Sequence, residues 1–167
     1  NPGGFDLGAG NDTFYGNVNL GRLDLDLGPG NDRAWTMTKT ISFVYGGTGT
    51  DVINGGAGSD RIKGRPGNKR LYGGGGGDAL FKYGPGRGFL DGGSGSNTLW
   101  GGPGNDTLLG GRAPYDRNRQ SWMNGAGGTD TYIGSAANDV VVDNFGKSIV
   151  KLGAGRDTVT VDRRRTN

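Results

Sequence analysis

The sequence predicts an all-β solenoid, in which short parallel strands coil into two sheets packed back to back. Three observations support this fold class. Glycine supplies 39 of the 167 residues, a nine-residue pattern recurs along most of the chain, and an apolar residue recurs at its eighth position. The pattern is Gly-Gly-x-Gly-x-Asp-x-apolar-x, and a repeat this regular outweighs any local feature in deciding the architecture. So much glycine also disfavours helices, since each interior glycine costs about 1 kcal/mol relative to alanine.

The clearest units occupy residues 46–109 and read GGTGTDVIN, GGAGSDRIK, GRPGNKRLY and GGGGGDALF. After a one-residue slip at Lys82 they continue as YGPGRGFLD, GGSGSNTLW and GGPGNDTLL. One unit, a six-residue turn and a three-residue strand, buries nothing alone. Stacked units pair their strands and point the eighth residue inward. The predicted core is Phe14, Ala34, Ile53, Ile62, Leu71, Leu80, Leu90, Leu99, Leu108, Tyr132, Val141 and Val159.

The flanking regions continue the pattern with local irregularities. LDLDL at 23–27 and ISFVY at 41–45 have the alternation or the β-branched and aromatic content of strands. RAPYDRNRQ, at 112–120, interrupts a unit and predicts an exposed insertion loop, and 143–151 is a glycine-poor unit with a strand at Ile149 and Val150. We therefore expect a single domain over residues 1–162, followed by a basic tail at 163–167.

Two units make one coil of about eighteen residues, so the sixth positions alternate between two edges of the solenoid. One edge is predicted to carry Asp12, Asp32, Asp51, Lys69, Gly88, Asp106 and Asp130. The other is predicted to carry Asp60, Asp78, Asn97, Asp139 and Asp157.

Stacked carboxylates about 5 Å apart repel one another unless a positive charge lies between them. A hard divalent cation with oxygen ligands removes that repulsion, and the tight turns add backbone carbonyl groups. Ca²⁺ fits, because it accepts six to eight oxygens in flexible geometry, whereas Mg²⁺ requires a tighter octahedron. Transition metals favour histidine or cysteine, and the chain has neither.

The units GGAGSDRIK, GGPGNDTLL and GAGNDTFY resemble the calcium-binding nonapeptide of the RTX family of secreted bacterial proteins. The resemblance implies a right-handed parallel β-roll with several Ca²⁺ ions between stacked turns, bound by sixth-position aspartates and turn carbonyls. It also implies export to a calcium-rich medium, folding there, and a secreted or cell-surface location. The implied metal ligands are Asp12, Asp32, Asp51, Asp60, Asp78, Asp106, Asp130, Asp139 and Asp157.

The chain departs from the family pattern at Lys69, Gly88 and Asn97. One hypothesis is that Lys69, together with Arg65 or Arg87, places its own cation where calcium would bind. The alternative is simple decay of sites that are no longer needed.

Catalysis is not expected, because the chain has no histidine, cysteine or glutamate, and its aspartates are assigned to metal. A nucleotide site fails as well, since no helix follows the glycine loops. No apolar run approaches 18 residues, so no membrane span is expected. The remaining function is structural or binding, and nucleic acid is a poor partner for an exported protein.

Two alternatives remain beside a purely calcium-stabilised roll. The first is a binding module for an acidic polysaccharide, since basic and aromatic residues alternate on the outward positions. The residues proposed for it are Arg61, Lys63, Phe81 and Trp100 on one sheet, with Arg70 and Tyr72 on the other. A solvated sheet with incidental aromatic residues would look the same in sequence. The second is a self-assembling surface or filament subunit, because a solenoid ends in open strands.

Overall fold

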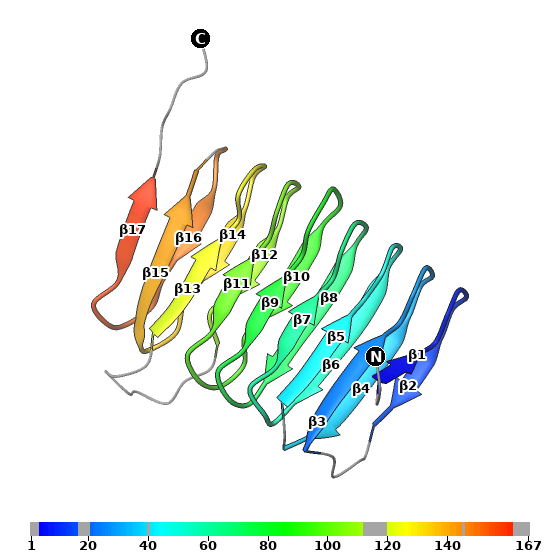
Figure 1. The fold of residues 1–167 in the computed structure, drawn as a ribbon. Coiled ribbons are helices and arrows are strands. Elements are labelled where there is room, and N and C mark those ends of the chain that lie inside the picture. Colours follow the sequence, from blue (N-terminus) through cyan, green and yellow to red (C-terminus); the bar gives the residue numbers. More distant parts are fainter. Residues whose placement is uncertain (1–3, 17–20, 40, 112–119, 145, 162–167) are drawn as a thin grey trace.

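The structure is a computed structural model that describes residues 4–16, 21–39, 41–111, 120–144 and 146–161. In these residues every regular element is a strand, and all strand pairs are parallel. Successive strands alternate between two sheets, so the chain winds as a solenoid (Figure 1). The predicted all-β parallel roll is therefore confirmed.

We name the two sheets by the numbers of their strands. The odd sheet contains, in spatial order, β1 (Gly4–Asp6), β3 (Arg22–Asp26), β5 (Ile41–Tyr45), β7 (Arg61–Lys63), β9 (Ala79–Phe81), β11 (Thr98–Trp100), β13 (Gln120–Asn124), β15 (Asn138–Asp143) and β17 (Thr158–Val161). The even sheet contains β2 (Thr13–Tyr15), β4 (Arg33–Thr38), β6 (Asp51–Gly56), β8 (Lys69–Gly74), β10 (Gly88–Asp91), β12 (Thr107–Leu109), β14 (Thr131–Ile133) and β16 (Ile149–Lys151). The turns that lead into each sheet form its edge, called the odd edge and the even edge below.

A single column of apolar side chains lies between the sheets, as the eighth positions predict. Most of the predicted core residues are fully buried: Ala34, Ile53, Ile62, Leu71, Leu80, Leu90, Leu99, Leu108, Tyr132 and Val141. Leu23, Leu25, Leu27, Val44 and Met123 extend the same core through the coils whose turns have lost the repeat.

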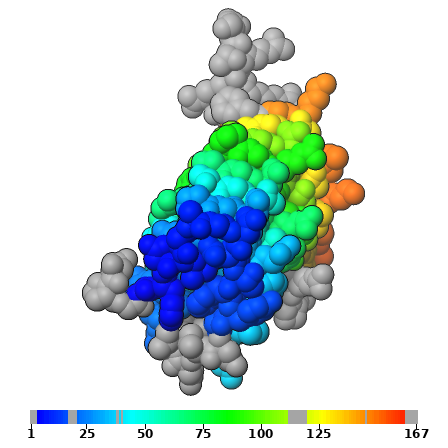
Figure 2. Space-filling view, turned by 90° about the vertical axis from the view of Figure 1, so that its right-hand side faces the viewer, coloured from blue at the N-terminus to red at the C-terminus, as the bar shows by residue number. Residues whose placement is uncertain are grey.

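The two predicted core residues nearest the ends of the roll are less buried. Phe14 is partly buried against the core, and Val159 is 44% exposed. Val159 lies in β17, the last strand of the odd sheet, so only β15 pairs with it. At the opposite end, the N-terminal coil with β1 and β2 lies in front of the rest of the roll (Figure 2).

The glycines of the turn have a steric role that no other residue fills. Gly47 has φ +71°, and a Cβ there would overlap the carbonyl oxygen of Gly28 in the preceding coil. Both the left-handed backbone and the close approach of coils therefore require glycine at the second position of this unit.

In the irregular units, the structure confirms the expected strands and corrects one boundary of the expected loop. ISFVY forms β5, and Ile149 and Val150 lie in β16. Gln120 belongs to β13 and not to the expected loop, because β13 pairs with β15 from that residue onward. The rest of that loop, residues 112–119, and the basic tail at 163–167 lie outside the described residues. No described helix is long and apolar enough to cross a membrane.

Candidate metal centres

The side chain at the sixth position of a unit ties one coil to the next. On the even edge the backbone N–H of Asp12 donates to Asp32 Oδ1 at 2.8 Å, and that of Asp32 donates to Asp51 Oδ1 at 3.0 Å. Further along the same edge, the Asp106 N–H donates to Asp130 Oδ1 at 2.8 Å. Each of these carboxylates uses one oxygen to hold the register between coils.

The odd edge has the same ladder of hydrogen bonds, but some of its acceptors are neutral. The backbone N–H groups of Ser42 and Asp60 donate to Asp60 Oδ1 at 2.7 Å and Asp78 Oδ1 at 2.8 Å, respectively. Asp78 then donates to Asn97 Oδ1 at 2.9 Å, and Asn97 donates to Ser121 Oγ at 3.4 Å. An amide and a hydroxyl here take over the acceptor role of the acids without their charge.

The second oxygen of most of these aspartates has no partner. In the described part of the chain, every buried side-chain nitrogen or oxygen without a hydrogen bond is an aspartate Oδ2 atom. These atoms belong to Asp12, Asp32, Asp60, Asp78 and Asp130. Buried polar atoms are nearly always paired, so these unpaired oxygens are candidate ligands for a cation.

A small space lies beside these oxygens because the unit begins with glycine. A Cβ added at Gly55 would come 2.5 Å from Asp60 Oδ2 and 2.8 Å from the carbonyl oxygen of Gly73. A Cβ at Gly73 would likewise meet Asp78 Oδ2 and the carbonyl oxygen of Gly92. The first glycine of the unit thus keeps open a space bordered by a carboxylate oxygen and a backbone carbonyl oxygen.

Burial makes these carboxyl groups difficult to ionise. It raises the pKa of Asp60 to about 6 and that of Asp78 to about 7, where the Asp60 charge adds to the effect. It raises the pKa of Asp130 to about 6 and shifts the pKa of Asp32 in the same direction. A cation close to the carboxylates would oppose this shift, because it favours their charged form.

Lys69 supplies such a cation in the middle of the even edge. Its Nζ lies 2.5 Å from Asp51 Oδ2, and both side chains are fully buried. The same ammonium donates to the carbonyl oxygens of Gly49 at 2.7 Å and Pro66 at 3.1 Å. The hypothesis that Lys69 places a cation at this edge is supported. The arginines proposed beside it lie elsewhere, since Arg65 stacks over the Tyr45 ring and Arg87 is exposed.

Lys82 is a second buried cation, which the sequence analysis did not identify. Its Nζ donates to the carbonyl oxygens of Gly86 at 2.6 Å and Pro103 at 3.0 Å, and to Asp106 Oδ1 at 3.0 Å. A Cβ at Gly88 would come 2.8 Å from Lys82 Cδ, so the lysine side chain fills the space that a sixth-position side chain would need. The space beside Gly88 is therefore filled by the Lys82 side chain.

The slip in the repeat explains how Lys82 reaches this place. Its backbone N–H bonds to the next coil just as the N–H groups of Gly64 and Gly101 do, so Lys82 occupies the first position of a unit. That unit, residues 82–91, has one residue more than the repeat. Lysine replaces its first glycine, and Gly88, which pairs with Lys69, takes the place of the sixth residue. In the sequence, this contact could have been found from a lysine at the first position of a unit that also lacks the sixth-position aspartate.

The last two predicted ligands, Asp139 and Asp157, lie on the odd edge near the C-terminal end. Asp139 Oδ2 accepts hydrogen bonds from the Ser135 N–H at 2.7 Å and from Ser135 Oγ at 3.2 Å. Asp157 is half-buried and accepts the Asp139 N–H at 2.9 Å. Both oxygens of Asp139 therefore have hydrogen-bond partners, and neither of these aspartates has a buried, unpaired oxygen.

The repeat itself matches a known family model, that of the RTX calcium-binding nonapeptide repeat. Four copies match, over residues 5–18, 45–80, 83–113 and 124–159. This chain belongs to the RTX repeat family. Searches of curated proteins and of solved structures found no significant match. The nonapeptide repeats of this family bind calcium, and the four matches imply several ions.

The donor atoms of this RTX chain fit calcium. No group of three or more acidic side chains gathers in the described residues, so a ligand set here would combine single carboxylates with backbone carbonyls. Such all-oxygen sets suit a hard cation with flexible coordination. The unpaired Oδ2 atoms and the open space beside the first glycines meet both requirements.

The residues predicted to bind a polymer lie on both outer faces of the roll. Arg61, Lys63, Phe81 and Trp100 belong to the odd sheet and project outward, exposed or half-buried. Arg70 and Tyr72 belong to β8 of the even sheet, where the Tyr72 ring packs 5.7 Å from that of Phe89. The core separates the two groups, so they cannot form one site.

Proposed function

We propose that this chain is a calcium-stabilised β-roll of a secreted or cell-surface bacterial protein, and that it folds when calcium binds between its stacked turns. The observation that carries the proposal is the set of buried, unpaired aspartate oxygens along both edges. Its role is structural, since the acids that could serve in catalysis are those that the metal would use.

The proposed ligands are the aspartates with an unpaired Oδ2 atom, which fall into three groups. They are Asp12 with Asp32, Asp60 with Asp78, and Asp130 alone. Asp139 and Asp157 are proposed as a weaker pair, since Ser135 already bonds one of them. Bound calcium would supply the positive charge that keeps these carboxylates ionised, while their Oδ1 atoms continue to hold the coil register.

Calcium removal tests the proposal directly. We expect circular dichroism to show less β-structure in chelator than in millimolar calcium, because the calcium-free coils whose aspartates have no lysine partner must bury unpaired charge around a thin core. An identical spectrum in both conditions would reject the folding role of calcium.

A double variant tests whether Asp60 and Asp78 bind calcium. Asp60→Asn with Asp78→Asn keeps both Oδ1 acceptors and removes both charges, so it should reduce the number of bound calcium ions measured by equilibrium dialysis. Asp91→Asn is the matched control, since within the described residues Asp91 accepts just the nearby Gly93 N–H, at 3.0 Å. Equal calcium binding by the double variant and the control would exclude the Asp60 and Asp78 site.

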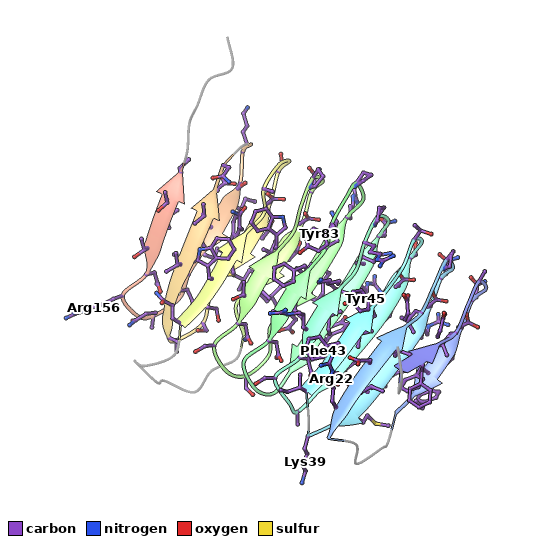
Figure 3. The ribbon with its side chains drawn as sticks, viewed as in Figure 1. Arg22, Lys39, Phe43, Tyr45, Tyr83 and Arg156 are labelled. Atoms are coloured by element: carbon purple, nitrogen blue, oxygen red, sulfur yellow. The ribbon has the colours of Figure 1, made fainter. Side chains whose placement is uncertain are left out.

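A second candidate function, binding of an acidic polysaccharide, is supported by the outer face of the odd sheet. Arg22 Cζ lies 4.1 Å from the centre of the Phe43 ring, and Lys63 Nζ lies 5.4 Å from that of Tyr45. Arg22, Phe43 and Tyr45 lie together in Figure 3, with Tyr83 further along the roll. Cations held against half-buried rings on an outer face suit a polymer with flat sugar faces and carboxylate groups.

The aromatic row continues along the same face. The rings of Phe81 and Tyr83 stack with centroids 5.7 Å apart, and those of Trp100 and Trp122 lie 6.0 Å apart. On the opposite sheet, a hollow of about 460 Å³ has Arg70, Arg87 and Phe89 in its lining. The odd face is the stronger candidate, because its rings form a longer row.

Binding to polygalacturonate, with a neutral glucan as control, tests this second function. Arg61→Ser with Lys63→Ser should weaken salt-sensitive binding, whereas Arg70→Ser on the opposite sheet should not. Equal affinity for the acidic and the neutral polymer would reject this candidate and leave the structural role.

A further inference from the structure

The even edge changes character in its middle. Near one end, Asp12 and Asp32 have unpaired Oδ2 atoms, and beyond the middle so does Asp130. Between them, Asp51 and Asp106 are paired with lysines. The unpaired and the paired acids therefore occupy the same positions in the repeat but differ in what neutralises them.

We propose that Lys69 and Lys82 are built-in replacements for calcium, so that the middle of the even edge is neutralised by the chain itself and does not bind the ion. The inference rests on the calcium role proposed for the other aspartates. It goes beyond that role because it divides one edge of the roll into metal-bound and metal-free sections.

The contacts of both ammonium groups resemble those expected for a bound cation. Each Nζ has one aspartate carboxylate and two backbone carbonyl oxygens as partners: Asp51, Gly49 and Pro66 for Lys69, and Asp106, Gly86 and Pro103 for Lys82. These are the same classes of donor atom that border the open spaces elsewhere. An ammonium group spends its three N–H donors on these oxygens and brings its positive charge to the position between them, where a metal ion would otherwise lie.

The two lysines reach equivalent places from different positions in the repeat. Lys69 replaces the sixth-position aspartate itself. Lys82 replaces the first glycine of its unit, which is tolerated only because Gly88 at the sixth position has no side chain to compete for the space. Random decay of calcium sites would not produce two buried ammonium groups with the same set of partners.

Acetylation of the unmodified protein tests the inference without any variant. In chelator, Lys69 and Lys82 should react about tenfold or more slowly than the exposed Lys151, because a buried amine reacts only after local opening. Mass spectrometry of the peptides measures each rate. If all three lysines react at the same rate in chelator, the two buried lysines do not hold these coils without calcium and the inference is wrong.

Restoring the family pattern should create a calcium site. Lys69→Asp would place a carboxylate beside Asp51, and we expect it to bind one more calcium ion per chain than the wild type by equilibrium dialysis. Lys151→Asp makes the same charge change on the surface and should leave the number unchanged. A folded Lys69→Asp protein with the wild-type number of ions would overturn the proposal.

The second lysine provides an independent variant if the first does not fold. Lys82→Gly with Gly88→Asp returns that unit to the repeat pattern and should also add one ion.

The two proposals fail in different ways. A wild type that binds no calcium rejects the proposed function, whereas calcium binding with unprotected lysines rejects this inference alone.

Discussion

The two edges of the roll have the same turn geometry but balance their buried charge differently. On the even edge, Asp51 and Asp106 are paired with lysines from neighbouring coils. On the odd edge, Asp60 and Asp78 remain unpaired, and the ladder then continues through Asn97 and a serine. In its middle, the even edge has two lysine ammonium groups, whereas the odd edge has neutral side chains in place of aspartates.

This difference separates two roles that the repeat combines in one aspartate. The first role is to accept a backbone N–H from the adjacent coil, and Asn97 and Ser121 fill it as neutral groups. The second is to bind a cation, which requires the charge and the second oxygen. A sixth-position residue can therefore lose its metal role and still hold the register.

Removing a lysine should break the even edge most severely. Lys69→Met or Lys82→Met leaves a buried carboxylate without its cation, and we expect a loss of about 3–5 kcal/mol in the free energy of unfolding in chelator. Urea unfolding followed by circular dichroism measures the loss. Lys151→Met, at an exposed position, should change stability by no more than about 0.5 kcal/mol. Similar losses at all three positions would contradict the pairing.

Neutralising an acid on the odd edge should have opposite effects with and without calcium. Asp60→Asn keeps an acceptor for the Ser42 N–H but removes the unpaired charge. We expect it to stabilise the chain in chelator by about 1–3 kcal/mol, since the buried charge is removed and the new amide nitrogen lies near the Gly73 carbonyl, as Asn97 Nδ2 lies near that of Gly110. In millimolar calcium it should destabilise the chain, because a ligand is lost. Thermal unfolding in both conditions checks the reversal, and a change of the same sign in both would refute it.

The smallest effect is expected where the odd edge carries no charge. Ser121 Oγ donates to the Gly110 carbonyl at 2.7 Å and accepts the Asn97 N–H at 3.4 Å. Ser121→Ala should cost about 1 kcal/mol, the typical contribution of a hydrogen bond. The loss should be equal in calcium and in chelator, and urea unfolding under both conditions measures it. A loss confined to calcium would show that Ser121 supports a metal site.

The fold could be predicted from the sequence because the repeat leaves few choices. Each unit offers one inward apolar residue, so the buried column from Ile53 to Leu108 follows from the period alone. The arrangement of sixth positions on two edges follows from the coil length, and the register of Asp51 with Lys69 confirms it. The fold was harder to predict where the glycines are missing. The period does not reveal Met123 or Val44, since tertiary packing alone places them in the core.

The candidate sites could be predicted only in part. The predicted ligands were all carboxylates, so two serines of the ladder were missed. The Ser42 N–H donates to Asp60 Oδ1, and Ser121 Oγ accepts the Asn97 N–H. Lys82 was missed as well, because an alignment on the glycines treats it as an extra residue between two nine-residue units. The role of that lysine depends on the missing side chain of Gly88 and on Asp106 in the next coil, and a single unit shows neither.

The position of the two lysines has a consequence for the order of folding. Coils in a solenoid contact only their neighbours, so structure spreads outward from whichever coils form first. A nucleus of lysine-paired coils around β6 to β12 would leave a growing end on each side, and each added coil closes a loop of only about eighteen residues. A nucleus at either terminus would offer one growing end. Calcium arriving at Asp32 and at Asp130 would then extend the roll in both directions at once.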